Sequence, residues 1–97
     1  MRPSEILQLK REQVLALIAK SRAANVRVFG SVERGEDREG SDLDLLVDPL
    51  PGATLFDLGA LQLDLEDLLG VRVDLLAPGD IPAIRRGRIL RDALPII

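Results

Sequence analysis

The apolar residues in the first quarter of the chain recur at the spacing of an α-helix. The set comprises Ile6, Leu7, Leu9, Val14, Leu15, Leu17 and Ile18. Ser4 is a suitable N-cap, because its side-chain oxygen can accept a hydrogen bond from a backbone N–H in the first turn. The pattern therefore predicts one helix that begins at Ser4 and continues to about Ala24, where Asn25 interrupts it.

Three later segments have the short apolar runs that are typical of β-strands. They are residues 26–29, 43–47 and 71–76, and glycine, proline or aspartate lies close to the end of each. In the second and third segments apolar residues occupy alternate positions, so each predicted strand has one apolar face. We expect the three segments to belong to one sheet.

Two more helices are predicted in the second half of the chain. Leucines recur on one side of residues 54–69, Thr54 can cap the start, and Gly70 suits the C-cap. Pro82 suits the first turn of a last helix that continues toward Ala93. Residues 31–41 and 48–52 read as exposed connections, the first with a helical turn that begins at Ser31. The predicted order is α-β-β-α-β-α, in a single domain over residues 1–97.

Composition excludes several kinds of catalytic site. The 97 residues contain no Cys and no His, which rules out the common zinc sites, cysteine nucleophiles and Ser-His-Asp triads. Any metal must therefore be held by oxygen ligands, and any general base must be a carboxylate, a lysine or the substrate itself.

The net charge and the hydropathy of the chain bear on whether it binds nucleic acid or a membrane. The net charge is −3 and the chain has no Tyr and no Trp, so we expect no direct binding to nucleic acid. The sequence has neither a run of about 18 apolar residues nor a secretion leader, so we expect no membrane span. The expected location is the cytoplasm.

Two aspartates interrupt the second predicted strand. Asp42 and Asp44 fall on one face, roughly 6.6 Å apart, while Leu43 and Leu45 fall on the other. Aspartate is disfavoured in strands, so a function rather than folding can explain the pair. Asp74 occupies an equivalent position in the third strand and would lie beside the pair if the two strands were neighbours.

Three neighbouring carboxylates repel one another, and a divalent cation such as Mg²⁺ removes that repulsion. The alternative is that each of these aspartates is an ordinary solvent-facing side chain.

A Gly30-Ser31 pair follows the first predicted strand. Glycine permits a close approach of the backbone to another group, and free N–H groups at a helix start suit a phosphate. By itself such a pair is usually a plain turn, and it is not a P-loop because the Gly-Lys-Ser/Thr sequence is missing. The joint occurrence of Gly30, Ser31, Asp42 and Asp44 at this spacing is expected by chance in about one chain in a thousand of this length.

The combined pattern resembles the signature of a known family. Gly30-Ser31, ten intervening residues and Asp42-Leu43-Asp44 are similar to the motif of the minimal nucleotidyltransferases, a reduced branch of the DNA polymerase beta superfamily. Further positions of that motif are matched by Arg34, Gly35 and Ser41, and Asp74 in VRVDLL lies where the third superfamily carboxylate belongs. The segment RRGRIL resembles the closing helix of the family.

The resemblance implies an α+β fold of the polymerase beta type, with a small mixed sheet of about three or four strands flanked by helices. It implies ATP as substrate and two Mg²⁺ ions. The implied catalytic and metal-binding residues are Asp42, Asp44 and Asp74, and the implied nucleotide-binding residues are Gly30, Ser31, Arg34 and Ser41.

The resemblance also implies a partner. Such proteins are often antitoxins that transfer AMP to a tyrosine of a HEPN-domain ribonuclease toxin, in a hetero-complex or with further copies of themselves. Since this chain has no Tyr, a tyrosine acceptor must come from another protein. Two alternatives are an antitoxin that neutralises its toxin by binding alone, and a transferase for small molecules, which usually needs an additional domain.

The last predicted helix is strongly basic. It carries Arg85, Arg86, Arg88 and Arg91. A solvated basic face near a helix C-terminus is one interpretation, because the helix dipole favours cations there. A docking surface for an acidic partner is the other.

Overall fold

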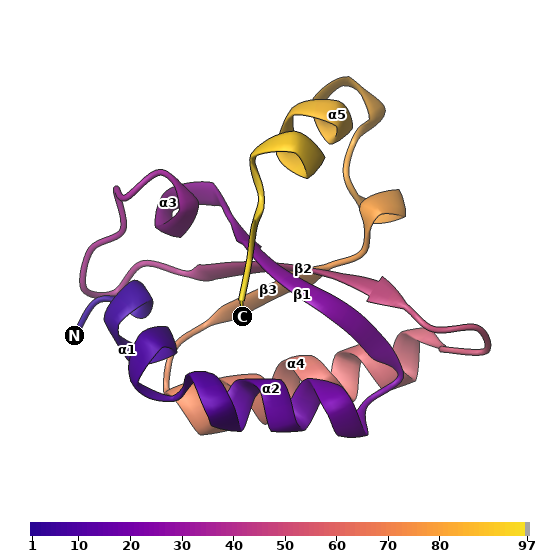
Figure 1. The fold of residues 1–97 in the computed structure, drawn as a ribbon, viewed down its shortest axis with the longest axis horizontal. Helices are drawn as coiled ribbons and strands as arrows, with labels where there is room; N and C mark the ends of the chain where they lie inside the picture. Colours follow the sequence, from indigo (N-terminus) through magenta and orange to yellow (C-terminus); the bar gives the residue numbers. More distant parts are fainter. Residues whose placement is uncertain (97) are drawn as a thin grey trace.

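The computed structural model describes residues 1–96 and has an α+β fold built on one mixed sheet (Figure 1). The four strands are β1 (Ala23–Phe29), β2 (Leu43–Pro49), β3 (Val73–Leu76) and β4 (Leu94–Pro95). Their order across the sheet is β3-β2-β1-β4. The β2–β3 pair is parallel, and β1 is antiparallel to both β2 and β4. The predicted fold class is confirmed.

Helices lie on both sides of this sheet. The elements are α1 (Pro3–Leu9), α2 (Arg11–Lys20), α3 (Gly30–Glu33), α4 (Leu55–Leu69), the 3₁₀ turn η1 (Pro78–Asp80) and α5 (Ala83–Asp92). Helices α2 and α4 run along one face, whereas α5 stands on the opposite side (Figure 1). Within residues 1–96, none of these helices has the length and apolarity that crossing a membrane requires.

The main core lies between the sheet and α2 and α4. Leu43, Leu45 and Val47 alternate along β2 and are fully buried, as their spacing predicts. They belong to one apolar cluster with Leu61 and Leu65 of α4. Each such side chain contributes roughly 1.5–3 kcal/mol when it is removed from water. The alternate positions of β2, which include Asp44, lie on the other face of the strand and are not part of this core.

Part of the opposite face is covered as well. Leu46 is fully buried although it lies on the same side of β2 as Asp44. The turn η1 contacts β2, and Ile81, which follows η1 directly, is only 2% exposed. The C-terminal half of this face of β2 is therefore closed by the segment that leads into α5, and Asp44 lies at the end that stays open.

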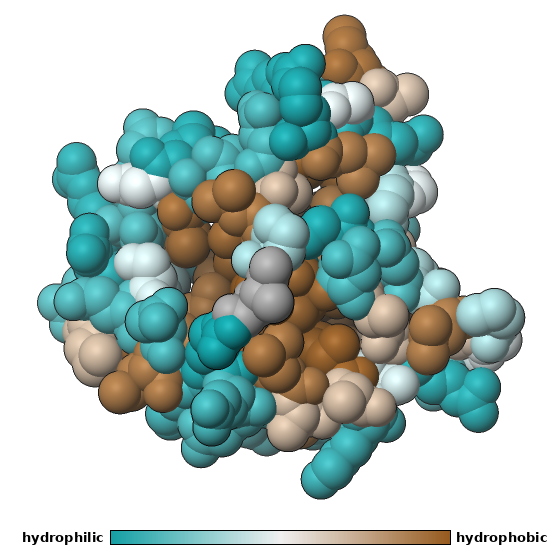
Figure 2. All heavy atoms as spheres, viewed as in Figure 1, coloured by the Kyte–Doolittle hydropathy of each residue, from teal (hydrophilic) through white to brown (hydrophobic). Residues whose placement is uncertain are grey.

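Apolar residues also reach the surface. In the view of Figure 2 they gather in the middle of the molecule, between α1 and α2 below and α5 above, with hydrophilic residues around them. The short strand β4 descends across this region (Figure 1). It pairs with Arg27 and Val28 of β1, and so returns the chain from α5 to the sheet.

The predicted first helix is wrong at its start, in its middle and at its end, since α2 stops at Lys20 and not at about Ala24. It is interrupted at Lys10, whose Nζ atom donates a hydrogen bond of 2.8 Å to the Leu68 carbonyl oxygen of α4. Ser4 is not an N-cap but lies inside α1, where Arg2 is the cap and Pro3 is the first residue. Proline is favoured at that first position, because its missing N–H would have no partner there in any case.

Asn25 does not separate a helix from a strand but lies within β1. Its φ is 57°, in the left-handed region that asparagine tolerates, and the register of β1 against β2 shifts between Ala24 and Arg27. The Asn25 side chain donates a hydrogen bond of 2.9 Å to Asp48 Oδ2. Strand β1 therefore begins three residues earlier than predicted, at Ala23 instead of Val26.

The α4 prediction is confirmed at both ends. Thr54 Oγ1 accepts a hydrogen bond of 3.2 Å from the Asp57 N–H, and Gly70 ends the helix with a φ of 70°. Strand β3 is shorter than predicted and begins at Val73, whereas β4 was not predicted.

Candidate active site

Asp44 and Asp74 are direct neighbours across two parallel strands. Strands β2 and β3 pair in register with Asp44 opposite Asp74 and Leu43 opposite Val73. Paired residues on adjacent strands lie on the same face of a sheet, and the strands are about 4.8 Å apart. The second and third predicted strands are therefore neighbours, as is required for Asp74 to lie beside the aspartates of the second strand.

Asp42 lies just before β2, at the entrance to the same face. Its side chain is 53% exposed, and its Oδ1 atom is 3.9 Å from Arg72 Nε. Within residues 1–96, no three acidic side chains are arranged as a ready cation site. The three aspartates therefore share one end of the sheet, but Asp42 turns toward Arg72, and their role as metal ligands stays a prediction.

The Asp44 carboxylate is in an unfavourable environment for a negative charge. Burial raises its pKa above the ordinary value of 3.8, and the charges of Asp74 and Asp42 raise it further. Arg34 acts in the opposite direction and lowers the pKa. A cation bound beside Asp44 would offset the same repulsion, so the chemistry of this donor set suits a divalent metal ion.

Gly30 packs its backbone against this carboxylate. A Cβ atom on residue 30 would overlap the Asp44 carboxylate, and the φ of Gly30 is 70°. The preceding residue, Phe29, is the register partner of Asp44 across β1 and β2. Both the backbone conformation and the space therefore require glycine at this position.

The other nucleotide-binding residues predicted from the motif lie along the chain that follows Gly30. Ser31 belongs to the single turn α3, and its carbonyl oxygen accepts a hydrogen bond of 2.8 Å from the Glu36 N–H. Arg34 is exposed and pairs with Glu36. Ser41 Oγ accepts a hydrogen bond of 2.9 Å from the Arg38 N–H, so this hydroxyl holds the loop that leads to Asp42.

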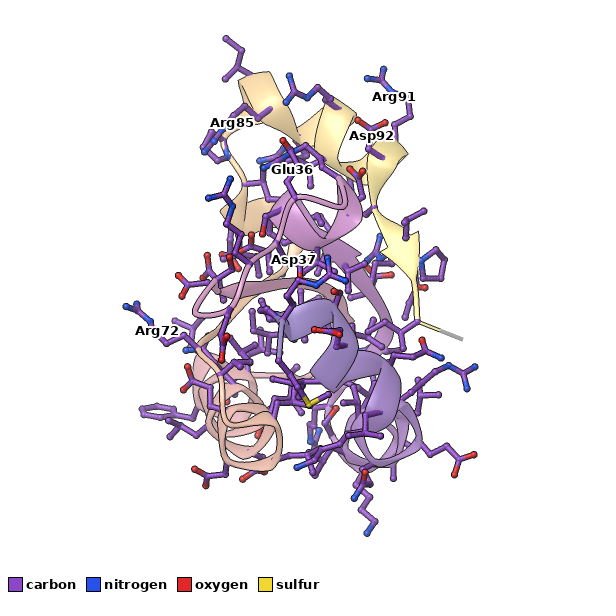
Figure 3. All side chains as sticks on the ribbon, turned by 90° about the vertical axis from the view of Figure 1, so that its left-hand side faces the viewer. Glu36, Asp37, Arg72, Arg85, Arg91 and Asp92 are labelled. Carbon is purple, nitrogen blue, oxygen red and sulfur yellow. The ribbon has the colours of Figure 1, made fainter. Side chains whose placement is uncertain are left out.

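A pocket of about 620 Å³ joins part of this motif to α5. It is lined by Phe29, Gly30, Glu33, Arg34, Asp44, Arg85, Arg88, Ile89 and Asp92. Figure 3 shows α5, with Arg85 and Asp92, above the loop that carries Glu36. Ser31, Ser41, Asp42 and Asp74 are not among the lining residues.

Sequence reasoning missed the contribution of α5 to this pocket. Relative to Arg85, the residues Arg88, Ile89 and Asp92 lie three, four and seven positions further along the chain, which places all four on one face of a helix. That signal was present in the sequence. What it could not reveal was which part of the molecule this face would meet.

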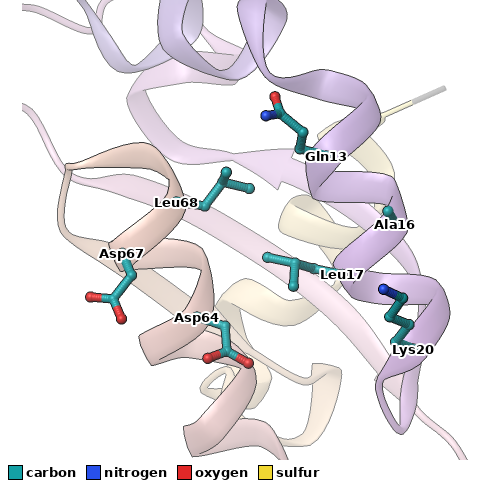
Figure 4. Close-up of a pocket in the computed structure, with 7 residues that line it drawn as sticks. All are labelled: Gln13, Ala16, Leu17, Lys20, Asp64, Asp67 and Leu68. Atoms are coloured by element: carbon teal, nitrogen blue, oxygen red, sulfur yellow. The ribbon is translucent and has the colours of Figure 1, made fainter.

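Another groove lies on the far side of the sheet, between α2 and α4 (Figure 4). Leu17 and Leu68 point into it, and Lys20, Asp64 and Asp67 stand along its rim. None of the motif residues lines this groove. The candidate active site is therefore the pocket beneath α5, together with the aspartates beside it.

The comparison with known proteins agrees with this geometry. Residues 10–95 match the family model described as a nucleotidyltransferase domain. A Methanocaldococcus jannaschii protein named "Putative protein adenylyltransferase MJ0435" is 35% identical over 92 residues, which cover 95% of this chain and 98% of the relative. The Thermococcus cleftensis "Protein adenylyltransferase MntA" is 39% identical over 69 residues, or 71% of this chain and 70% of the relative.

Solved structures share the fold. One that is described as a "putative minimal nucleotidyltransferase" has a TM-score of 0.84 at 52% identity, and the match covers 95% of this chain and 94% of that chain. A toxin–antitoxin structure with AMP-PNP has a TM-score of 0.74 at 17% identity, covering 89% and 71%, which supports the fold alone. The chain therefore belongs to the nucleotidyltransferase domain family and is a minimal nucleotidyltransferase of the DNA polymerase beta superfamily.

Proposed function

We propose that this protein is a Mg²⁺-dependent adenylyltransferase that acts as an antitoxin, by transferring AMP from ATP to a tyrosine of a HEPN-domain toxin. The observation that carries the proposal is the register of Asp44 with Asp74, at the end of the sheet where the Gly30 backbone meets Asp44. Two relatives named as protein adenylyltransferases support the reaction type. Structural neighbours that are toxin–antitoxin assemblies support the biological setting.

Asp42, Asp44 and Asp74 would hold the metal ions. When bound, two Mg²⁺ ions offset the charge that develops on the phosphate during transfer. The raised pKa of Asp44 supports this assignment, because burial and then the charges of Asp74 and Asp42 disfavour its ionised form, and a bound cation would offset both effects. Asp42, whose side chain is half exposed, can turn from Arg72 toward the other two carboxylates at little cost.

The remaining steps depend on residues of the protein. Gly30 and Ser31 would contact the outer phosphates, and Arg34, on the wall of the pocket, would contact them with its guanidinium group. The tyrosine oxygen forms a bond to the α-phosphorus, the bond from that phosphorus to the bridging oxygen breaks, and pyrophosphate leaves. Asp74 is exposed and would accept the proton of the tyrosine hydroxyl, a role for which this chain has no histidine.

The test is transfer of label from α-³²P-ATP to the co-encoded toxin, with Mg²⁺ present. We expect the native protein to label the toxin and Asp42→Asn to leave it unlabelled. Asp64→Asn is the matched control, because Asp64 is an exposed aspartate of α4 on the far side of the sheet.

Other outcomes separate the alternatives. Full labelling by Asp42→Asn would refute the metal assignment. Toxin that is neutralised but never labelled would identify an antitoxin that acts by binding alone, and label found on a small molecule would identify a different acceptor.

A further inference from the structure

Helix α5 is held by the Arg86 side chain near its start and by strand β4 after its end, rather than by buried apolar side chains. At the first end, Arg86 Nε and Nη2 donate hydrogen bonds of 2.9 Å to the carbonyl oxygens of Pro78 and Ile81. At the second end, β4 pairs with β1, and the Ile96 N–H donates to the Val26 carbonyl oxygen at 3.1 Å. No residue of α5 is buried. The helix is therefore placed over the open end of the sheet without serving as part of a core.

The arginines of α5 are not equivalent. Arg86 is occupied by its two carbonyl acceptors, and Arg91 Nε is 3.4 Å from Asp92 Oδ1. Within residues 1–96, the side chains of Arg85 and Arg88 make neither a hydrogen bond nor an ion pair. Two guanidinium groups on one helical face thus line the pocket with their donors free.

The surroundings of these two donors indicate what they bind. The pocket that Arg85 and Arg88 line contains a third guanidinium group, that of Arg34, and the Gly30 backbone. It also contains three carboxylates, those of Glu33, Asp44 and Asp92, of which Asp92 lies beside Arg91. A volume of about 620 Å³ lies within the range of about 300–1,000 Å³ that holds small molecules. Guanidinium groups match phosphate oxygens in a bidentate geometry, and free donors facing a concave site suit a small anion rather than a flat protein surface.

We propose that Arg85 and Arg88 bind the β- and γ-phosphates of the nucleotide, so that α5 acts as a clamp on the triphosphate tail. This inference rests on the proposed function for the identity of the nucleotide. It assigns to α5 a role in substrate binding, and it leaves Ile84 and Arg91, which do not line the pocket, for other contacts.

The test measures binding without turnover, by titration calorimetry with ATP, AMP and inorganic tripolyphosphate in Mg²⁺. For Arg85→Gln/Arg88→Gln we expect affinity for ATP and tripolyphosphate to fall at least about tenfold, because two charge-assisted contacts are lost. Affinity for AMP should change less than about twofold, because AMP has no β- or γ-phosphate. Arg91→Gln is the control, since it removes the same charge from the same helix outside the pocket.

Each result separates the clamp from the transferase assignment. Equal losses for ATP and AMP, or a loss in Arg91→Gln as large as for a single pocket arginine, would overturn the clamp. Unchanged ATP affinity in the double variant, with labelling of the toxin intact, would overturn the clamp and leave the transferase standing. Selective loss of tripolyphosphate binding in a protein that never labels the toxin would support the clamp and count against the proposed reaction.

Discussion

The backbone of Gly30 and the carboxylate of Asp44 occupy adjoining space, so closely that a Cβ atom on residue 30 would overlap the carboxylate unless the Asp44 side chain moved. The contact joins the two halves of the sequence motif, which are separated by the loop from Ser31 to Ser41. The missing Cβ atom of Gly30 leaves room for the Asp44 carboxylate, which is the most buried of the three aspartates that we assign to the metal. Gly30 thus gives the acidic site its space and is also a candidate phosphate contact.

Gly30→Ala should therefore reduce AMP transfer strongly and reduce the stability of the fold only moderately. We expect a loss of transfer of about 100-fold, because displacing a reacting group by about 1 Å has that effect. The positive φ should lower the free energy of unfolding by about 1–2 kcal/mol. Gly70→Ala is the control, since Gly70 has the same φ of 70° but nothing within 4 Å of a Cβ atom. Label transfer and urea denaturation measure the two effects, and full transfer by Gly30→Ala would contradict the explanation.

Asp44→Asn should abolish transfer and stabilise the fold. Because the folded state raises the pKa of Asp44, the folded protein binds a proton more readily than the unfolded chain does. Ionised Asp44 therefore opposes folding at pH 7. This penalty shrinks as the pH falls through the raised pKa of the folded state and is gone only below the ordinary value of 3.8. Asp44 is half-buried, so solvent screening limits the expected gain in unfolding free energy to about 1 kcal/mol at most. Denaturation at pH 7 in EDTA measures it, and a less stable Asp44→Asn would contradict the charge argument.

Asp37 should make the fold sensitive to acid. It is 4% exposed, and its Oδ2 atom accepts a hydrogen bond of 2.9 Å from the Ser4 N–H in the first turn of α1. Burial by itself raises the pKa of Asp37, but the hydrogen bonds from Ser4 outweigh it and hold the pKa below 3.8. Ionised Asp37 thus contributes stability above pH 3.8, and this contribution is lost as the pH falls through the lowered pKa of the folded state.

The variant Asp37→Asn tests whether ionised Asp37 stabilises the fold. At pH 7 we expect it to lower the unfolding free energy by about 1 kcal/mol, as the loss of a helix cap does. The difference from the native protein should shrink once the pH is well below 3.8. Glu39→Gln is the control in the same loop, because the Glu39 side chain is 85% exposed. A difference that stays constant across pH would show that the charge of Asp37 is not its source.

Arg86→Lys should loosen α5 without changing its charge. Arg86 reaches the carbonyl oxygens of Pro78 and Ile81 from two separate nitrogens of its planar guanidinium group, whereas lysine has a single nitrogen. We therefore expect one of the two hydrogen bonds to be lost. We expect the unfolding free energy to fall by about 1 kcal/mol and the amide hydrogens of α5 to exchange faster. Arg91→Lys, at an exposed position of the same helix, should do neither. Equal amide exchange rates of α5 in the two variants would show that the Arg86 hydrogen bonds do not hold the helix in place.

Much of the fold was predictable because it depends on short-range patterns. The alternation of Leu43, Leu45 and Val47 identified the buried face of β2, and the leucine spacing with Thr54 and Gly70 gave both ends of α4. These signals arise from the geometry of a single strand or helix, so no knowledge of distant contacts is needed to recognise them. The motif that includes Gly30 and Asp44 is a local pattern of the same kind.

The errors lie where a distant contact determines the local structure. The helix break at Lys10 accompanies a hydrogen bond to Leu68, and the extension of β1 through Asn25 accompanies one to Asp48. The strand β4 has only two residues and exists because β1 is there to pair with it. Local propensity is weak compared with such contacts, and it carries no information about them.

The sequence by itself determined the chemistry that is available: aspartates for a metal, arginines for phosphates, and no histidine, cysteine or tyrosine. It also determined the main apolar face of β2 and of α4. Only the tertiary structure decided that Asp74 lies opposite Asp44, that Asp42 turns toward Arg72, and that Arg85 and Arg88 share a pocket with Gly30. The physical reason is that these neighbours are brought together by strand order and by the path of the chain over the sheet, which depend on the packing of the whole domain.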